Sequence, residues 1–143
     1  MDQLDEELIE YVDSGITRYS DLAKKVNSPL STVHIRMKKL EQSGIIRGYK
    51  GDIDWSKAGF GITAYIFISI DVNLLQRLKK SQETLLKEIL SMEYVKEGYI
   101  VTGDADIMVK ILAKNTENLK EILLNGIDRI DGIVKTRAMI TLY

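Results

Sequence analysis

The stretch SPLSTVHIRMKKLEQSG, residues 28–44, contains the only proline and the only histidine of the 143-residue chain. It predicts a helix, because Ser28 is a favoured cap, Pro29 suits a first helical position and Gly44 suits the residue after the last turn. At 100° per residue, four apolar residues fall within about 80° and form a core stripe: Leu30, Val33, Met37 and Leu40. Ile35 points to the opposite face, where a polar residue is expected.

Two shorter helices are predicted before this stretch. Residues 4–14 carry apolar side chains at helical spacing and end at Ser14-Gly15. Ser20 is the expected N-cap of a helix over residues 21–27. Three helices in about 40 residues, with a tight turn between the second and third, are the layout of a helix-turn-helix.

A domain boundary is expected after these helices. Residues 45–54 have an extended but glycine-broken pattern, which predicts a short strand or wing. Three glycines then bracket a hinge: Gly51, Gly59 and Gly61. We therefore expect a helix-turn-helix domain at residues 1–50, a hinge or linker strand at 51–61 and a second domain at 62–143.

The second domain shows a strand, helix, strand, strand, helix, strand order. The predicted elements are strands at 62–72, 95–103, 106–113 and 132–143, and helices at 74–91 and from Asn115-Thr116 to about Ile127. A tight Gly103-Asp104 turn is expected between the two middle strands. This order predicts an α+β chain, in which a winged helix-turn-helix of three helices precedes a βαββαβ ferredoxin-like (ACT-like) sandwich.

The first strand of that sandwich, ITAYIFISI (62–70), is apolar on both faces. Isoleucines and Ala64 alternate along one face, and Tyr65 and Phe67 lie on the other. Two helices cover only one face of such a sheet. A large uncovered apolar face usually marks an interface, so we expect a homodimer formed through the sheet.

Composition excludes several classes of protein. The chain is 45% hydrophobic and 29% charged, contains no cysteine, and has an acidic N-terminus where a secretory signal would be basic. No apolar run approaches the ~20 residues that cross a bilayer. One histidine and no cysteine disfavour a metal site or a histidine-based triad. We expect a cytoplasmic protein with no metal, no cofactor and no membrane partner.

The distribution of charge is more informative than the net charge of −1. Residues 1–23 hold seven acids and one base, whereas residues 24–50 hold seven bases and one acid. Such a basic segment is the local footprint that a nucleic-acid interface leaves, although charge alone also fits a solvated surface.

Three segments carry a resemblance to a known family. LAKKVNSPLSTVHIRMKKLEQSGIIRGYKGDID (22–54), YIVTGDADIMVKI (99–111) and GIVKTRAMITL (132–142) are similar to the Lrp/AsnC ("feast/famine") transcription regulators of prokaryotes. The resemblance implies a helix-turn-helix that binds double-stranded DNA and a ferredoxin-like domain that dimerises and senses amino acids. It also implies assembly of dimers into tetramers or octamers.

The expected DNA-binding residues lie on and after the third helix. Short polar groups near its start suit base edges, and the bases suit phosphates. The candidates are Ser31, Thr32, His34, Ile35, Arg36, Lys38, Lys39, Arg47 and Lys50. Ile35 is either an idle surface residue or a contact to a thymine methyl group. Arg36 borders the core stripe, so it binds phosphate, pairs with an acid from residues 1–23, or combines both roles.

The expected effector-binding residues come from two segments. The resemblance implies that backbone N–H groups and carboxylates of the Gly-Asp-x-Asp turn hold the two charged ends of an amino acid, although a plain hairpin turn also explains the motif. The candidates are Thr102, Gly103, Asp104, Asp106, Thr136 and Ala138. Ala138 stands where the family commonly has Thr or Ser, so no particular amino-acid specificity transfers to this chain.

Two other functions are compatible with parts of this sequence. Siroheme decarboxylases resemble the same two-domain architecture, but they use histidines in the C-terminal half, and the only histidine here is His34. We therefore expect no enzymatic activity. A protein that organises DNA without sequence preference fits the basic segment, but such proteins are usually strongly basic overall.

Overall fold

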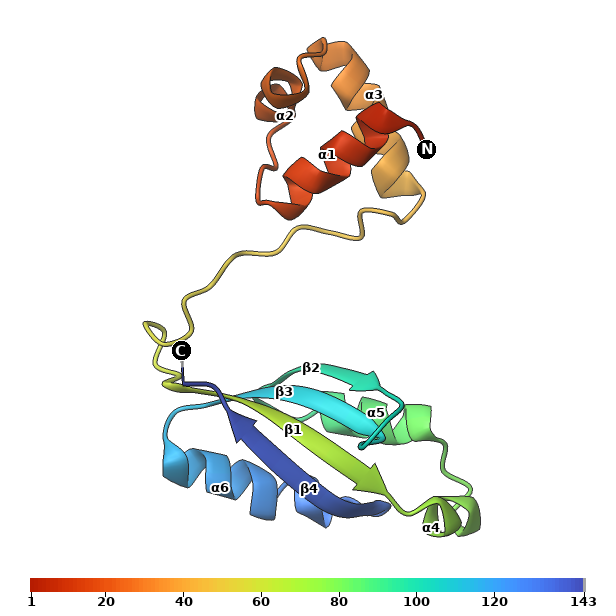
Figure 1. Ribbon diagram of the computed structural model, residues 1–143, viewed down its shortest axis with the longest axis vertical. Coiled ribbons are helices and arrows are strands. Elements are labelled where there is room, and N and C mark those ends of the chain that lie inside the picture. The colour runs from red at the N-terminus through yellow and green to blue at the C-terminus, as the bar shows by residue number, and fades with distance from the viewer. Residues whose placement is uncertain (143) are drawn as a thin grey trace. The chain divides into compact units, whose positions relative to one another are not determined.

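The structure is a computed structural model that describes residues 1–142. The chain divides into two compact units, Met1–Ile53 and Asp54–Tyr143 (Figure 1). Each unit has its own hydrophobic core. None of the helices found in residues 1–142 is long and apolar enough to cross a membrane.

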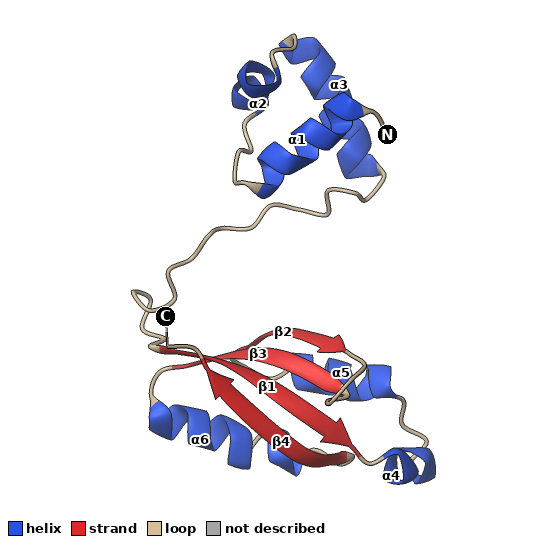
Figure 2. Cartoon of the chain, in the orientation of Figure 1, coloured by secondary structure: helices blue, strands red, loops and turns tan. Residues whose placement is uncertain are grey.

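The first unit is built from three helices (Figure 2): α1 Gln3–Asp13, α2 Tyr19–Val26 and α3 Leu30–Gln42. Their apolar faces meet in one cluster of buried side chains, namely Leu8, Leu22, Ala23, Val33, Met37, Leu40 and Ile46. This arrangement confirms the predicted helix-turn-helix. α1 begins with a capping box, in which Asp2 and Asp5 each accept a hydrogen bond from the other's backbone N–H.

Three details of the helix starts differ from the predictions. Ser20 is not a cap, because α2 already begins at Tyr19 and its N-cap is Arg18. Ser28 is not a cap either, because Pro29, with an extended ψ of 145°, occupies the N-cap of α3. Leu30 is 53% exposed and does not belong to the core cluster. The position of a residue in the helical repeat predicts the direction of its side chain. The side chain is buried only if another element packs against the helix at that residue, and no element among residues 1–142 buries Leu30.

The predicted wing at 45–54 and linker strand at 51–61 are wrong, because residues 45–61 contain no strand. A strand requires a hydrogen-bonding partner, and extended sequence without one stays a loop. Only Ile46 of this stretch is buried in the first unit. At the start of the second unit, the ring of Phe60 meets that of Trp55 edge to face at a centroid distance of 5.8 Å and lies tilted against that of Tyr94 at 5.6 Å.

The second unit is a four-stranded antiparallel sheet with the order β2-β3-β1-β4 (Figure 1). Its elements are β1 Ile62–Ile70, α4 Val72–Arg77, α5 Gln82–Leu90, β2 Val95–Ile100, β3 Ile107–Ala113, α6 Thr116–Leu124, the short 3-10 helix η1 Ile127–Arg129 and β4 Ile133–Ile140. This sheet order confirms the predicted ferredoxin-like sandwich.

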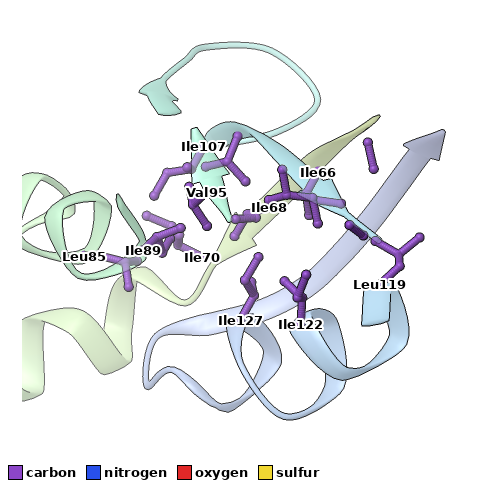
Figure 3. Close-up of a cluster of buried hydrophobic side chains, with 14 of the residues drawn as sticks. Ile66, Ile68, Ile70, Leu85, Ile89, Val95, Ile107, Leu119, Ile122 and Ile127 are labelled. Carbon is purple, nitrogen blue, oxygen red and sulfur yellow. The ribbon is translucent and has the colours of Figure 1, made fainter. Parts of the chain in front are cut away.

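The core of this unit lies between the sheet and its helices. Figure 3 shows side chains from β1 and β3 meeting those of α5 and α6 in this layer, among them Ile66, Ile107, Leu85 and Ile122. The alternation along β1 is confirmed, because Ala64 and the isoleucines at 66, 68 and 70 are buried. On the opposite face Tyr99 is 51% and Met139 is 63% exposed.

Several element boundaries also differ. The predicted single helix at 74–91 is two helices, because Lys79 takes a left-handed φ of 54° and Ser81 caps a new start. Strand β2 ends at Ile100, so the connection to β3 is a longer loop than the predicted two-residue turn. It is closed by a hydrogen bond from the Val101 N–H to the Asp106 carbonyl at 2.9 Å.

The C-terminal end of the unit shows two smaller differences. Ile127 belongs to η1 rather than to α6. The last strand is shorter than predicted, since β4 covers Ile133–Ile140. Residue 143, the final residue of the predicted strand, lies outside the described residues.

Candidate nucleic-acid interface and effector site

Helix α3 presents a polar, basic surface to solvent. Its inner face is fixed by Val33, Met37 and Leu40, which are 0–4% exposed. On the outer face Ile35 is 56% exposed. Four further candidates on this helix are also exposed, namely Ser31, His34, Lys38 and Lys39. Thr32 is half-buried. The structure therefore places these six side chains on one accessible surface of the helix.

Arg36 lies on the flank of α3 that faces α1. Its Nη1 atom donates to Asp2 Oδ2 at 2.6 Å and to both carboxylate oxygens of Asp5 at 3.2 and 3.3 Å. The hydrogen bond from Arg36 is the main reason that the pKa of Asp2 falls to about 2. Of the two roles expected for Arg36, the structure provides the ion pair with the acids of α1.

The other flank of α3 carries a second polar cluster. The carboxylate of Glu41 accepts hydrogen bonds from the hydroxyl groups of Tyr19 and Tyr49, the latter at 3.1 Å. Lys38 lies 4.0 Å from the same carboxylate, and its ammonium group is 5.9 Å from the centre of the Tyr19 ring. Desolvation and the hydrogen bond to Glu41 raise the pKa of Tyr19 to about 12, so its hydroxyl stays a donor.

The remaining contacts and candidates of this unit are those of His34, Arg47 and Lys50. His34 meets the edge of the Tyr19 ring, with the ring centroids 5.4 Å apart. Arg47 and Lys50 follow α3 in the exposed loop before residue 54. The basic side chains expected from the sequence thus belong to α3 and to the loop that leaves it.

The effector candidates of the β2–β3 loop are accessible except at Asp106. Thr102, Gly103 and Asp104 are exposed, and Gly103 has a φ of 129° that suits glycine. The Asp106 carboxylate instead accepts a hydrogen bond from the Ile70 N–H at 2.9 Å. Asp106 therefore has a structural role, because its carboxylate continues the hydrogen bonding between β1 and β3.

The other two effector candidates lie on β4. Thr136 pairs with Ile68 and Ala138 with Ile66, so β1 lies between these residues and the strand that begins after the loop. The Thr136 hydroxyl donates to Asp128 Oδ1 at 2.8 Å. Within one chain the six effector candidates thus form two groups on either side of β1.

Sequence reasoning did not single out five residues that lie on α3 or contact it: Asp2, Asp5, Tyr19, Glu41 and Tyr49. The spacing of Asp2 and Asp5 at the start of a predicted helix is a visible signal for a capping box. Asp128, the partner of Thr136, has no comparable signal in the sequence.

The fold and this surface define a class of two-domain proteins in which a helix-turn-helix precedes a ferredoxin-like domain. Comparison with known proteins identifies the family. The Lrp/AsnC ligand binding domain matches residues 63–143, and a winged helix-turn-helix DNA-binding domain matches residues 1–47. The chain belongs to the Lrp/AsnC family of transcription regulators.

Named relatives cover nearly the whole chain. The regulatory protein AsnC of Escherichia coli is 29% identical, over 99% of this chain and 90% of its own length. An uncharacterized HTH-type transcriptional regulator of Pyrococcus furiosus is 30% identical, over 98% of this chain and 90% of its own length.

Solved structures agree with the fold. The structure of E. coli AsnC superposes with a TM-score of 0.81 at 28% identity, covering 100% of this chain and 93% of that one. A transcriptional regulator of Neisseria meningitidis in complex with L-Met superposes with a TM-score of 0.84 at 18% identity, covering 100% and 90%. At that identity the second likeness establishes the fold alone.

Proposed function

We propose that the protein binds a palindromic or pseudo-palindromic promoter site on double-stranded DNA as a homodimer, and that a small amino acid modulates this binding. The observation that carries the proposal is the accessible surface of α3. Short polar groups, one apolar side chain and two lysines lie together on a helix anchored by a fully packed inner face. Such a helix fits the major groove and reads base edges there.

Two copies are needed for specificity, because one helix contacts too few base pairs. A two-fold dimer presents two recognition helices about 34 Å apart, which matches successive turns of the major groove. The sheet face that carries Tyr99 and Met139, opposite the helices, supports the dimer contact. Dimers of this family assemble further, and we extend this expectation to tetramers or octamers here.

The amino-acid effector is assigned to the ligand-binding domain. The exposed loop at Thr102, Gly103 and Asp104 offers backbone N–H groups and a carboxylate to the two charged ends of an amino acid. Thr136 and Ala138 supply a second group of contacts, and Asp128 joins them through its hydrogen bond to Thr136. The L-Met complex of the N. meningitidis regulator, which has the same fold, supports this class of ligand.

The protein acts in the cytoplasm by binding rather than by catalysis. Its relatives carry the names of transcription regulators, which supports this assignment. An absorbance spectrum of the purified protein tests for a siroheme-type enzyme, because haem absorbance would contradict a purely regulatory role.

Selection of binding sites from random DNA, with and without amino acids, tests the proposal. We expect enrichment of one symmetric motif, and a change in its enrichment with at least one amino acid. Recovery of unselected sequences would instead favour a protein that organises DNA without sequence preference. A thermal-shift screen against the twenty amino acids checks the effector independently, and the absence of any shift at millimolar concentrations would remove it.

A further inference from the structure

The recognition helix is held on both of its flanks by polar contacts made within the first unit. On one flank Arg36 binds Asp2 and Asp5 of α1, and on the other Glu41 binds Tyr19 of α2. These residues lie beside the core contacts of Val33 and Met37 rather than on the exposed face that carries Ile35. The two clusters therefore oppose rotation of α3 about its own axis in either direction.

We propose that Arg36 and Glu41 are positioning residues that fix the roll of α3 and thereby set DNA sequence preference, without contacting DNA themselves. This inference rests on the proposed function. A hydrogen bond or methyl contact to a base edge depends on geometry, so a small roll of the helix misplaces every base-reading side chain at once. Phosphate contacts by lysine are far more tolerant, because an ammonium group is a compact charge on a flexible stem.

The contacts around α1 show why Arg36 is committed to this role. Asp2 Oδ1 accepts from the Asp5 N–H at 3.1 Å, while Asp2 Oδ2 accepts from Arg36. Asp5 Oδ2 accepts both from the Asp2 N–H and from Arg36. Each carboxylate thus caps α1 and binds α3. Arg36 faces two acids, so releasing it for a phosphate would leave both of them beside the DNA.

The negative charges of Asp5 and Glu41 allow a test, because a charge effect and a positioning effect change the affinity for the preferred DNA site in opposite directions. If Asp5 and Glu41 acted only through charge, replacing either by its amide would strengthen binding to every DNA sequence, because a negative charge near the polyanion disappears. If they position α3, the same change weakens binding to the preferred site while binding to unrelated DNA stays the same or strengthens.

The experiment measures dissociation constants of the full-length protein by fluorescence anisotropy at several salt concentrations. One duplex carries the site obtained by selection, and a second is scrambled. The variants are Asp5→Asn, Glu41→Gln, Arg36→Gln and Tyr19→Phe, and the last removes a hydroxyl without changing charge. Matched controls are Asp13→Asn, at the exposed end of α1, and Tyr11→Phe, whose hydroxyl makes no hydrogen bond among residues 1–142.

We expect each variant to lower the specificity ratio about tenfold, comparable to the loss of one base contact, while the salt slope is unchanged. The controls keep the wild-type ratio. Arg36→Lys, which retains a cation for Asp2 and Asp5, restores most of the ratio that Arg36→Gln loses. Circular dichroism at the assay temperature identifies any variant that unfolds. We expect Tyr19→Phe to remain folded, because it removes only one hydroxyl group.

Two results would overturn the inference. One is a wild-type specificity ratio in the folded Asp5→Asn and Tyr19→Phe variants. The other is a uniform loss of affinity for both duplexes in Arg36→Gln with a salt slope smaller by about two for the dimer, about one for each Arg36, which would make Arg36 a phosphate ligand. Failure of the proposed function is a separate outcome, because the wild-type protein itself would then show no preference between the duplexes.

Discussion

Replacing Ile35 by alanine is expected to change DNA sequence preference without changing protein stability, because this side chain is on the exposed face of α3. Ile35 is 56% exposed, so its truncation removes little buried surface from the free protein. Alanine is also the better helix former, and the free energy of unfolding should change by no more than about 0.5 kcal/mol. Met37, two residues later and fully buried, is the matched contrast. Met37→Ala should cost about 2–5 kcal/mol.

The effect of Ile35→Ala on DNA binding follows from the same exposure. Burial of a methylene group is worth about 0.8 kcal/mol, and alanine lacks three of the carbons of isoleucine. Because about half of the side chain is already covered in the free protein, contact with a thymine methyl group contributes roughly 1–2 kcal/mol. Loss of that contact corresponds to a reduction in affinity of about 5- to 30-fold.

The assay compares wild type and Ile35→Ala on a panel of duplexes that differ by single base pairs from the selected site. We expect wild type to prefer A·T at one position in each half-site and the variant to lose that preference, with unchanged affinity for scrambled DNA. An equal loss of affinity on every duplex would exclude a specific contact between Ile35 and a thymine methyl group, as would unchanged affinity on all of them. An equal loss on every duplex would indicate misfolding or a contact that does not depend on DNA sequence. Unchanged affinity would indicate that Ile35 does not contact DNA.

Three further predictions concern salt, backbone conformation and pH. Lys39→Gln removes two lysines from the dimer, so it should lower the slope of log affinity against log salt by about 1.8, measured by anisotropy, with equal weakening on selected and scrambled DNA. An unchanged slope would exclude a phosphate contact. Gly132→Ala should destabilise the second unit by about 2 kcal/mol in urea unfolding, because φ is 105° and the new Cβ would lie 2.5 Å from Leu75 Cδ2; a wild-type midpoint would contradict this strain. The ion pair with Arg36 lowers the pKa of Asp2 from its ordinary value of 3.8 to about 2. The stabilising effect of this ion pair is therefore complete when the pH is above 3.8, and it is lost as the pH falls through about 2. The difference in stability between wild type and Asp2→Asn should therefore vanish in strong acid, and a difference that persists below pH 2 would exclude the ion pair as its source.

The sequence predicted the secondary structure best where hydrophobic periodicity was strong. The buried alternation along β1 and the buried stripe at Val33, Met37 and Leu40 reflect the solvent preference of each side chain, which is a local property. The turn chemistry was less reliable. Proline alone does not decide whether it is the cap or the first helical residue, and nothing in the composition of 74–91 marked Lys79 as a left-handed residue that divides two helices.

The missing wing shows a second limit. Residues 45–54 have the composition of a strand, but strand formation depends on a partner that a single-chain pattern does not reveal. The candidate effector residues show the same limit at a larger scale. The motif at Thr102–Asp106 was visible, whereas its separation from Thr136 by β1 follows from the sheet order.

The type of protein follows from the sequence, namely three helices, a βαββαβ unit and a basic segment around the third helix, because periodicity and charge are encoded residue by residue. The partner of each polar side chain, by contrast, follows only from the three-dimensional arrangement of the helices. Arg36 was compatible with phosphate or with any of seven acids, and folding brings it to Asp2 and Asp5, more than thirty residues away. Polar contacts between distant segments depend on distances of a few tenths of a nanometre, and those distances exist only once the hydrophobic cores have placed the helices.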